Sequence, residues 1–117
     1  QRQMIAEINQ LYRPAMIVLD GLEAFTDGGP ESGTLVKPEL MLLGTDRVAV
    51  DAVGVAVLRI YGGNATVSRG RVFDQDQIAR AARLGLGVPG PDRIDLVTDD
   101  PESRKVAERI RDVLKQG

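Results

Sequence analysis

The chain has 117 residues, of which 43% are hydrophobic and 27% are charged, so it is long enough to bury a core and too apolar to be intrinsically disordered. A formal net charge of -2, with two Tyr, two Phe and no Trp, offers neither a positive field nor stacking platforms for nucleic acid. The absence of Cys and His excludes a thiolate nucleophile, an imidazole base and a cysteine-held cluster within this chain. Any chemistry must therefore use carboxylates, hydroxyls, Lys, Arg, Tyr or backbone groups.

The start of the chain shows no signal-peptide pattern, and no apolar run reaches the roughly 20 residues that span a bilayer. We therefore expect a soluble, cytoplasmic protein without a membrane partner. The sequence lacks an initiator Met and opens inside an apparent helix, so we expect residues 1–117 to be a single α/β domain cut from a longer protein. Such a piece would be part of a larger domain.

The first third of the chain predicts a helix, a strand and a long loop. Residues 3–12 place apolar side chains at helical spacing, and Pro14 ends this helix. Residues 15–19 form a continuous apolar run rich in branched side chains, as in a strand covered on both faces. The stretch 20–38 is rich in Gly and Pro and is much longer than common connections, so we expect a functional loop.

A second strand is predicted at 39–43, followed by a helix that Asp46 caps and that runs to about Tyr61. This helix has almost no polar face, so we expect it to be central and buried. Its many Val residues would also fit a strand, but its length and its capping residue favour a helix.

The rest of the chain predicts two more helices and a third strand. Asp74 and Gln77 resemble a capping box that opens a helix ending at Gly85. Residues 94–98 are a short strand candidate, and Asp100 caps a last helix on the surface. Because strands and helices alternate after the loop, we expect an α/β fold with a small sheet of about three strands and helices packed on it.

Acidic residues follow both early strands. If these strands are parallel, Asp20 and Asp46 lie at the same sheet edge, where open α/β sheets gather ligands, and Asp99 and Asp100 reach that edge after the third strand. Carboxylate oxygens suit Mg²⁺ or Ca²⁺, so Asp20 and Asp46 are the candidate metal ligands. If the two strands are antiparallel, the two carboxylates lie at opposite ends and this cluster does not form.

The glycine-rich loop adds ligand-binding candidates. Its backbone amides suit an anion, so a small anionic molecule bridged by a divalent cation would satisfy both the loop and the carboxylates. The loop lacks the Lys and spacing of a Walker loop and the setting of a dinucleotide fingerprint, so a solvated loop tip is the competing interpretation. The candidates in and beside the loop are Gly21, Glu23, Gly28, Gly29 and Gly33.

Asp51 falls in the middle of the apolar helix, where an unpaired carboxylate is costly. One interpretation pairs it with Arg47, one turn earlier on the same helix face. In the other, Asp51 accepts hydrogen bonds from amides of the glycine-rich loop or contacts a ligand there. For Asp20, Asp46 and Asp100, ordinary turn and helix-cap roles compete with ligand binding.

Three blocks in this order, IVLDGLE at 17–23, GGPESGT at 28–34 and GTDRVAVDA at 44–52, resemble the proteins catalogued as domain of unknown function 362. The resemblance covers residues 1 to about 98 and looks like the C-terminal portion of that domain. Members often carry a ferredoxin-like segment, which implies an iron-sulfur cluster in another part of the full-length protein, because this chain has no Cys. The resemblance marks as signature residues, without catalytic roles, Asp20, Gly21, Gly28, Gly29, Pro30, Gly33, Asp46 and Asp51.

Two functions of different classes follow. The first is an enzyme fragment that binds a divalent cation such as Mg²⁺ and a small anionic ligand, with Asp20, Glu23, Asp46 or Asp51 as ligands or general base. The second is a non-catalytic module that docks a redox partner or the ferredoxin-like domain of the full-length protein. A third interpretation, in which the loop plugs the sheet, gives the same residues a structural role.

Overall fold

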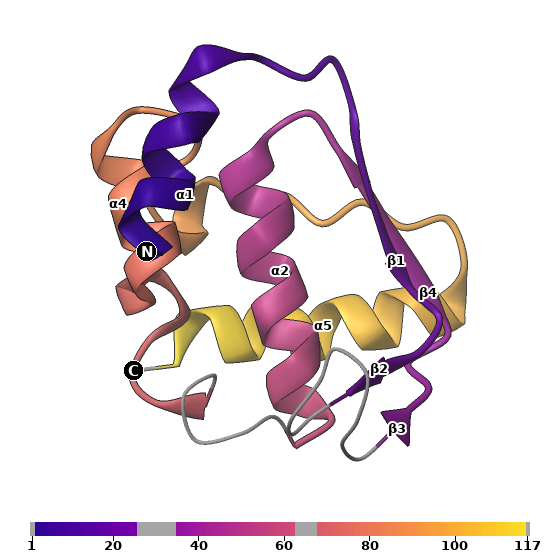
Figure 1. Ribbon diagram of the computed structural model, residues 1–117. Coiled ribbons are helices and arrows are strands. Elements are labelled where there is room, and N and C mark those ends of the chain that lie inside the picture. Colours follow the sequence, from indigo (N-terminus) through magenta and orange to yellow (C-terminus); the bar gives the residue numbers. More distant parts are fainter. Residues whose placement is uncertain (1, 26–34, 63–67, 117) are drawn as a thin grey trace.

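The computed structural model describes residues 2–25, 35–62 and 68–116. Within these ranges, helices pack on short antiparallel strand pairs, which confirms the predicted α/β class (Figure 1). None of the helices in these ranges is long and apolar enough to cross a membrane. The helices are α1 (Arg2–Ile8), α2 (Arg47–Ile60), α4 (Asp76–Arg83) and α5 (Pro101–Lys115), with short 3-10 helices at Asn9–Leu11, Val72–Asp74 and Pro91–Arg93.

Strands β1 (Ile17–Gly21) and β4 (Leu40–Gly44) form an antiparallel pair, the β1–β4 ribbon. Both strands begin within two residues of their predicted positions. Asp20 lies opposite Met41 in this register, so the strands run in opposite directions and the predicted parallel arrangement is wrong.

The connection between β1 and β4 explains their antiparallel direction. It contains a second antiparallel pair, β2 (Ala24–Phe25) with β3 (Leu35–Val36), inside the stretch predicted to be a loop. The chain therefore folds back on itself as a hairpin, whereas parallel strands would need a crossover connection, usually a helix.

Helix α2 is central, as predicted, between the β1–β4 ribbon and the α1–α4 pair, with α5 behind it (Figure 1). Asp46 caps the helix, because its Oδ1 accepts a hydrogen bond of 2.9 Å from the amide of Ala49. Gly54 allows the ribbon to approach, since a Cβ there would lie 2.8 Å from Cδ2 of Leu19. Burying each Val of α2 contributes about 1.5–3 kcal/mol. The buried residues of α2 are Val48, Val50, Ala52, Val53, Ala56 and Val57.

Helix α1 is attached to the rest of the fold at two points. Glu7 forms an ion pair with Arg80 of α4, with Oε1 and Nη2 3.0 Å apart. Just beyond the same C-terminal end of α1, Nη1 of Arg47 donates to the carbonyl oxygens of Asn9 at 2.6 Å and Tyr12 at 2.7 Å. The same guanidinium lies 5.7 Å from the centre of the Tyr12 ring. Arg47 therefore provides partners for carbonyl groups that the end of a helix leaves without intrahelical bonds.

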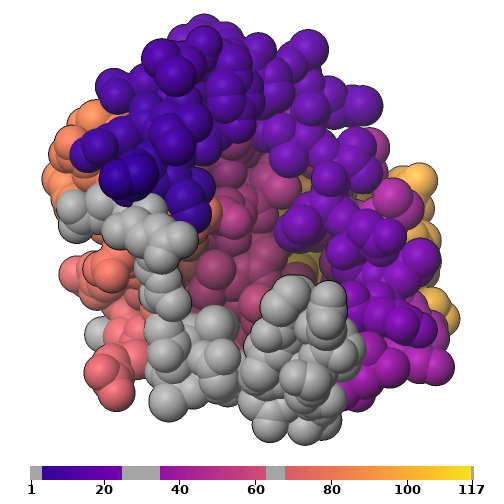
Figure 2. All heavy atoms as spheres, in the orientation of Figure 1, coloured from indigo at the N-terminus to yellow at the C-terminus, as the bar shows by residue number. Residues whose placement is uncertain are grey.

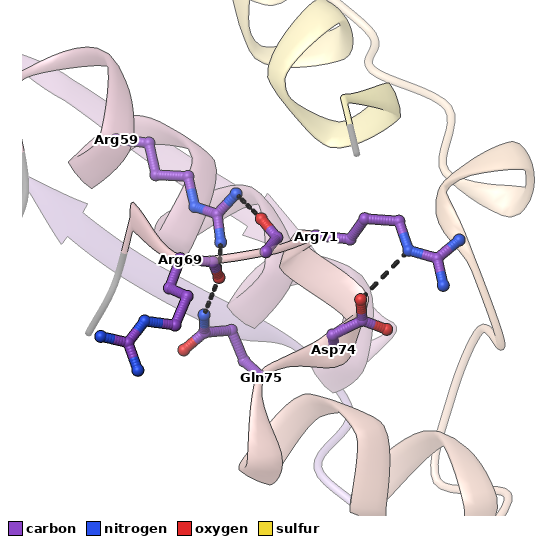
Figure 3. A network of polar contacts seen from close by, with 6 residues as sticks. Arg59, Arg69, Arg71, Asp74 and Gln75 are labelled. Carbon is purple, nitrogen blue, oxygen red and sulfur yellow. Dashed lines mark hydrogen bonds and ion pairs between the residues drawn. The ribbon is translucent and has the colours of Figure 1, made fainter. Parts of the chain in front are cut away.

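A polar network holds the segment between α2 and α4 (Figure 3). The guanidinium of Arg59 donates to the carbonyl oxygens of Arg69 at 3.1 Å and Gly70 at 2.7 Å. The side-chain amide of Gln75 donates to the same Arg69 carbonyl at 3.2 Å. These bonds connect the last turn of α2 to the residues that precede α4.

Helix α4 begins two residues after the predicted cap. Asp74 lies in the preceding 3-10 helix and pairs with Nε of Arg71 at 3.1 Å (Figure 3). Gln77 donates to Oδ2 of Asp51 at 3.3 Å. The predicted capping box is therefore wrong, because both of its side chains have other partners. The predicted end is confirmed, since Gly85 has a φ of 72°, the left-handed conformation that favours glycine.

The predicted third strand at 94–98 is wrong, because these residues belong to no ladder in the described chain. Their burial nevertheless alternates as in a strand. Ile94 and Leu96 are half-buried against the core, whereas Asp95 and Val97 are exposed. The sequence pattern thus identified which side chains point inward, but the segment lacks a strand to pair with.

Helix α5 begins where the sequence predicts. Oδ1 of Asp100 accepts from the amide of Ser103 and Oδ2 accepts from its hydroxyl, both at 2.8 Å. These bonds, that of the amide most of all, stabilise the charged carboxylate and lower the pKa of Asp100. The helix cap accounts for Asp100 without a ligand.

Candidate functional site

The two predicted metal ligands lie at opposite ends of the β1–β4 ribbon. Asp20 is opposite Met41, near the start of β4, whereas Asp46 follows the end of β4 at Gly44. The antiparallel pairing therefore does not bring these carboxylates to one edge. In the part of the chain that the structure describes, no group of three or more acidic side chains is arranged to hold a metal ion.

Asp20, Gly21 and Glu23 lie at the end of β1 and in the turn that follows. Oδ1 of Asp20 accepts a hydrogen bond of 2.9 Å from the amide of Leu22, which is the turn role expected of an Asp-Gly pair. The side chain of Glu23 is exposed. Outside the described residues lie the remaining candidates Gly28, Gly29 and Gly33, whose ligand-binding role stays a prediction.

Both carboxylate oxygens of Asp46 accept from backbone amides. Oδ1 accepts from Ala49 at 2.9 Å, and Oδ2 accepts from Val88 at 3.0 Å. Val88 belongs to the connection after α4, so Asp46 joins this connection to the start of α2. Gly87 permits the close approach, because a Cβ there would overlap Oδ1 of Asp46 and lie 2.8 Å from Cγ2 of Val48. Asp46 is therefore a bridging residue of the fold.

A cavity of about 220 Å³ opens between α1, β1, α2 and α4. In Figure 2, α2 is visible at the floor of a hollow between the indigo N-terminal segment and β1. An apolar wall with a few convergent polar groups is typical of small-molecule sites, but this cavity is below the about 300 Å³ at which such sites begin. The polar residues in its wall are Asn9, Arg47, Asp51 and Gln77.

Asp51 lines this cavity, and its Oδ2 accepts a hydrogen bond from Nε2 of Gln77 on α4. The residue as a whole is exposed, yet the surrounding protein partly desolvates its carboxyl group, which raises the pKa of Asp51. The bond from Gln77 lowers this pKa but is the weaker effect. The predicted pair with Arg47 is not formed, because that guanidinium binds the carbonyls of Asn9 and Tyr12.

The sequence analysis missed Gln77 as the partner of Asp51 and Gly87 as the residue that lies against Asp46. The sequence contains no sign of the contact between Gln77 and Asp51, because it joins two helices that are separate in the sequence. It does contain a sign of the role of Gly87. Three glycines fall within residues 85–90, and only Gly85 is needed to end the helix, so a close backbone approach at one of the other two could have been expected, and the structure shows it at Gly87.

The fold is of the α/β class, and a comparison with protein families finds a match over the part of the chain that contains the three sequence blocks at 17–23, 28–34 and 44–52. Residues 1–56 match the family model described as Domain of unknown function (DUF362). This match confirms the resemblance over the three blocks and ends soon after Asp51. No curated protein and no solved structure shows a significant match. The iron-sulfur cluster that the family resemblance implies does not fit this chain, which has neither Cys nor His to ligate it.

Replacing Gly87 with Ala should destabilise the chain by roughly 1–3 kcal/mol, because the new Cβ displaces the Asp46 carboxylate from its amides. Urea denaturation followed by circular dichroism measures this loss. Gly90→Ala is the matched control, because a Cβ at Gly90 meets nothing within 4 Å and its φ of -169° is extended backbone. Equal stability of the two variants would contradict the bridging role of Asp46.

Replacing Asp51 with Asn should give a small gain in stability near neutral pH and none in strong acid. The folded chain holds the Asp51 proton more tightly than the unfolded chain does, because the folded pKa is raised above 3.8. Stability therefore falls as the pH rises from the unfolded pKa through the folded pKa, and the neutral Asn removes this fall. The gain is small because the residue is exposed.

Urea denaturation of wild type and Asp51→Asn across this pH window measures the difference. Asp92→Asn removes an exposed carboxylate outside the cavity and controls for net charge. Identical pH profiles for wild type and Asp51→Asn would show that the environment of Asp51 does not disfavour its charge.

Proposed function

We propose that the chain is a non-catalytic docking module whose β1–β4 ribbon packs against a second polypeptide layer. One observation carries this proposal. The ribbon face that points away from α2, the outer face, consists of Val18, Asp20, Met41 and Leu43. Its three apolar residues are 49%, 55% and 65% exposed, respectively, and Val18 lies directly opposite Leu43.

Strands that are apolar on both faces are typical of sheets covered on both sides. On the inner face, Leu19 packs against Gly54 of α2, and Leu42 contributes to the core beside α2. Nothing in the described chain covers the outer face to the same degree. Helix α2 already covers the inner face of the ribbon, so a second layer over the outer face would bury the apolar area that remains exposed.

The ferredoxin-like domain that the family resemblance implies is the partner we propose for this face. A cluster-bearing domain would bring its own cysteine ligands, which this chain lacks. In this arrangement the ribbon positions a neighbouring redox domain and carries out no chemistry itself.

An isolated ferredoxin-like domain with its paramagnetic cluster should broaden the amide NMR signals of Val18, Asp20, Met41 and Leu43 in this chain. The matched variant replaces the three apolar residues of the outer face with Thr, which keeps strand propensity while it removes apolar area. We expect the variant to stay folded and to lose the broadening. If the broadening occurs elsewhere, or persists in the variant, the outer face is not the docking surface.

The second candidate function is binding of a divalent cation and a small anionic ligand by the glycine-rich loop with Asp20, Asp46 and Asp51. The chemistry of the residues supports it, because backbone amides of a glycine-rich loop suit an anion and carboxylate oxygens suit a divalent cation. The separation of Asp20 from Asp46 and the use of both Asp46 oxygens by amides weigh against a shared cation. We therefore place it second.

Titration with Mn²⁺ should leave the amide signals of Thr45, Asp46 and Asp51 unbroadened, because both oxygens of Asp46 already accept from amides. The Mn²⁺ concentration is kept below the level at which any exposed carboxylate binds the ion. Mg²⁺ and Ca²⁺ serve as diamagnetic controls in the same experiment. Selective broadening of both the Asp20 and the Asp46 regions would reverse our ranking and favour the cation site.

A further inference from the structure

A groove of about 950 Å³ lies between β4, the stretch 93–100 and helix α5. One wall is the continuous stretch 38–46, which contains all of β4. The opposite wall is the stretch 93–100, which passes behind the β1–β4 ribbon in Figure 1 before it enters α5. The floor is apolar and comes from α2 and α5, with Ala49, Val50, Val53, Val106, Ala107 and Ile110.

The groove runs along the edge of β4. Side chains of a strand alternate between its two faces, so a groove on one face would contact only every second residue. Every residue of β4 lines the groove, and no residue of β1 does. The groove therefore lies along the edge of β4 that faces away from β1.

This edge presents backbone groups to the groove. In an antiparallel pair, part of the amides and carbonyls of a strand point to the partner and the rest point to the other edge. Among the described residues β4 pairs only with β1, and no backbone bond joins it to the opposite wall. Residues 94–98 of that wall also belong to no ladder. A free strand edge beside a groove is how many domains add an extended peptide to a sheet.

The walls of the groove are strongly acidic, although the whole chain carries a net charge of only -2. Arg93 is the one basic residue in the described lining. The ion pairs of the described chain are Arg71–Asp74 and Arg80–Glu7, so none of the groove carboxylates is neutralised by one. The carboxylates of the lining are Glu39, Asp46, Asp95, Asp99, Asp100 and Glu102.

We propose that this groove binds an extended, basic segment of a partner protein, which adds a strand to the free edge of β4. The segment alternates apolar residues, which face the floor formed by α2 and α5, with Lys or Arg, which face the carboxylates. Five residues of such a strand span about 17 Å, the length of β4. The inference goes beyond the proposed docking function, because the groove is a second surface, separate from the outer face, that takes a segment of different chemistry.

A second copy of this chain fits the groove less well. Pairing β4 with β4 of another copy would bring Glu39 and Asp46, which flank the strand, close to the same residues of the partner. Like charges placed opposite one another across a strand pair are destabilising. The charge of the groove therefore favours a basic segment from a different protein.

A short peptide of alternating Val and Lys, with blocked termini, tests the proposal. We expect it to shift the amide signals of Leu40–Gly44 and of residues 94–98, and to bind more weakly as salt rises. A peptide with Glu in place of Lys should not bind. A peptide N-methylated on the edge that meets β4 should bind about tenfold or more weakly, because it loses several backbone hydrogen bonds.

Charge variants of the chain provide the matched comparison. Asp95→Lys with Asp99→Lys should weaken binding of the basic peptide severalfold, whereas Asp92→Lys with Glu108→Lys makes the same charge change outside the groove and should not. Urea denaturation of both double variants verifies that they fold.

Three outcomes would overturn the proposal. The first is no binding of the Val-Lys peptide at millimolar concentration, the second is binding of the acidic or the N-methylated peptide as tight as that of the Val-Lys peptide, and the third is dimerisation of the chain through β4. If the peptide instead shifts Val18 and Asp20, the groove proposal fails while the docking function survives. If the ferredoxin-like domain leaves the outer face unaffected but the peptide binds β4, the docking function fails and the groove proposal survives.

Discussion

The carboxylate of Asp46 joins three segments that determine the shape of the molecule. It follows the end of β4, caps the first turn of α2 through Ala49, and holds the connection after α4 through Val88. Because α2 forms the centre of the core, the position of its first turn determines where the β1–β4 ribbon and α4 can pack. A Cβ on residue 87 would occupy the space that this carboxylate needs. One carboxylate, whose two oxygens both accept from backbone amides, thus fixes the position of the segments that surround an aliphatic core.

Local signals in the sequence predicted the elements well. The caps at Asp46 and Asp100 marked the starts of α2 and α5 because these residues bond to amides within the next three positions. Asp74 carries the same signal, but its carboxylate pairs with Arg71, so the cap it predicts does not form. The sequence does not show which partner a capping side chain takes, since Asp46 caps its helix although Arg47 is its neighbour.

What the sequence could not predict depends on pairing between distant residues. The directions of β1 and β4 follow from the hairpin between them, and the segment 94–98 has the burial pattern of a strand without a ladder. The candidate site failed in the same way, since grouping Asp20 with Asp46 required parallel strands. Asp51 was recognisable as unusual because a carboxylate interrupts an apolar helix, but its partner, Gln77, lies on another helix and was not.

The two attachments of α1 differ in their physical nature. In the first, the Arg47 guanidinium, which stays charged wherever proteins fold, binds the neutral carbonyl groups of Asn9 and Tyr12 just after the helix. In the second, Glu7 of the last turn and Arg80 of α4 form an ion pair that is partly open to solvent and is weakened by dissolved ions. Ionic strength therefore weakens the contact of α1 with α4 more than its contact with α2, although the two lie within one turn of each other. In concentrated salt α1 should loosen from α4 first, while Arg47 still holds the residues that follow the helix.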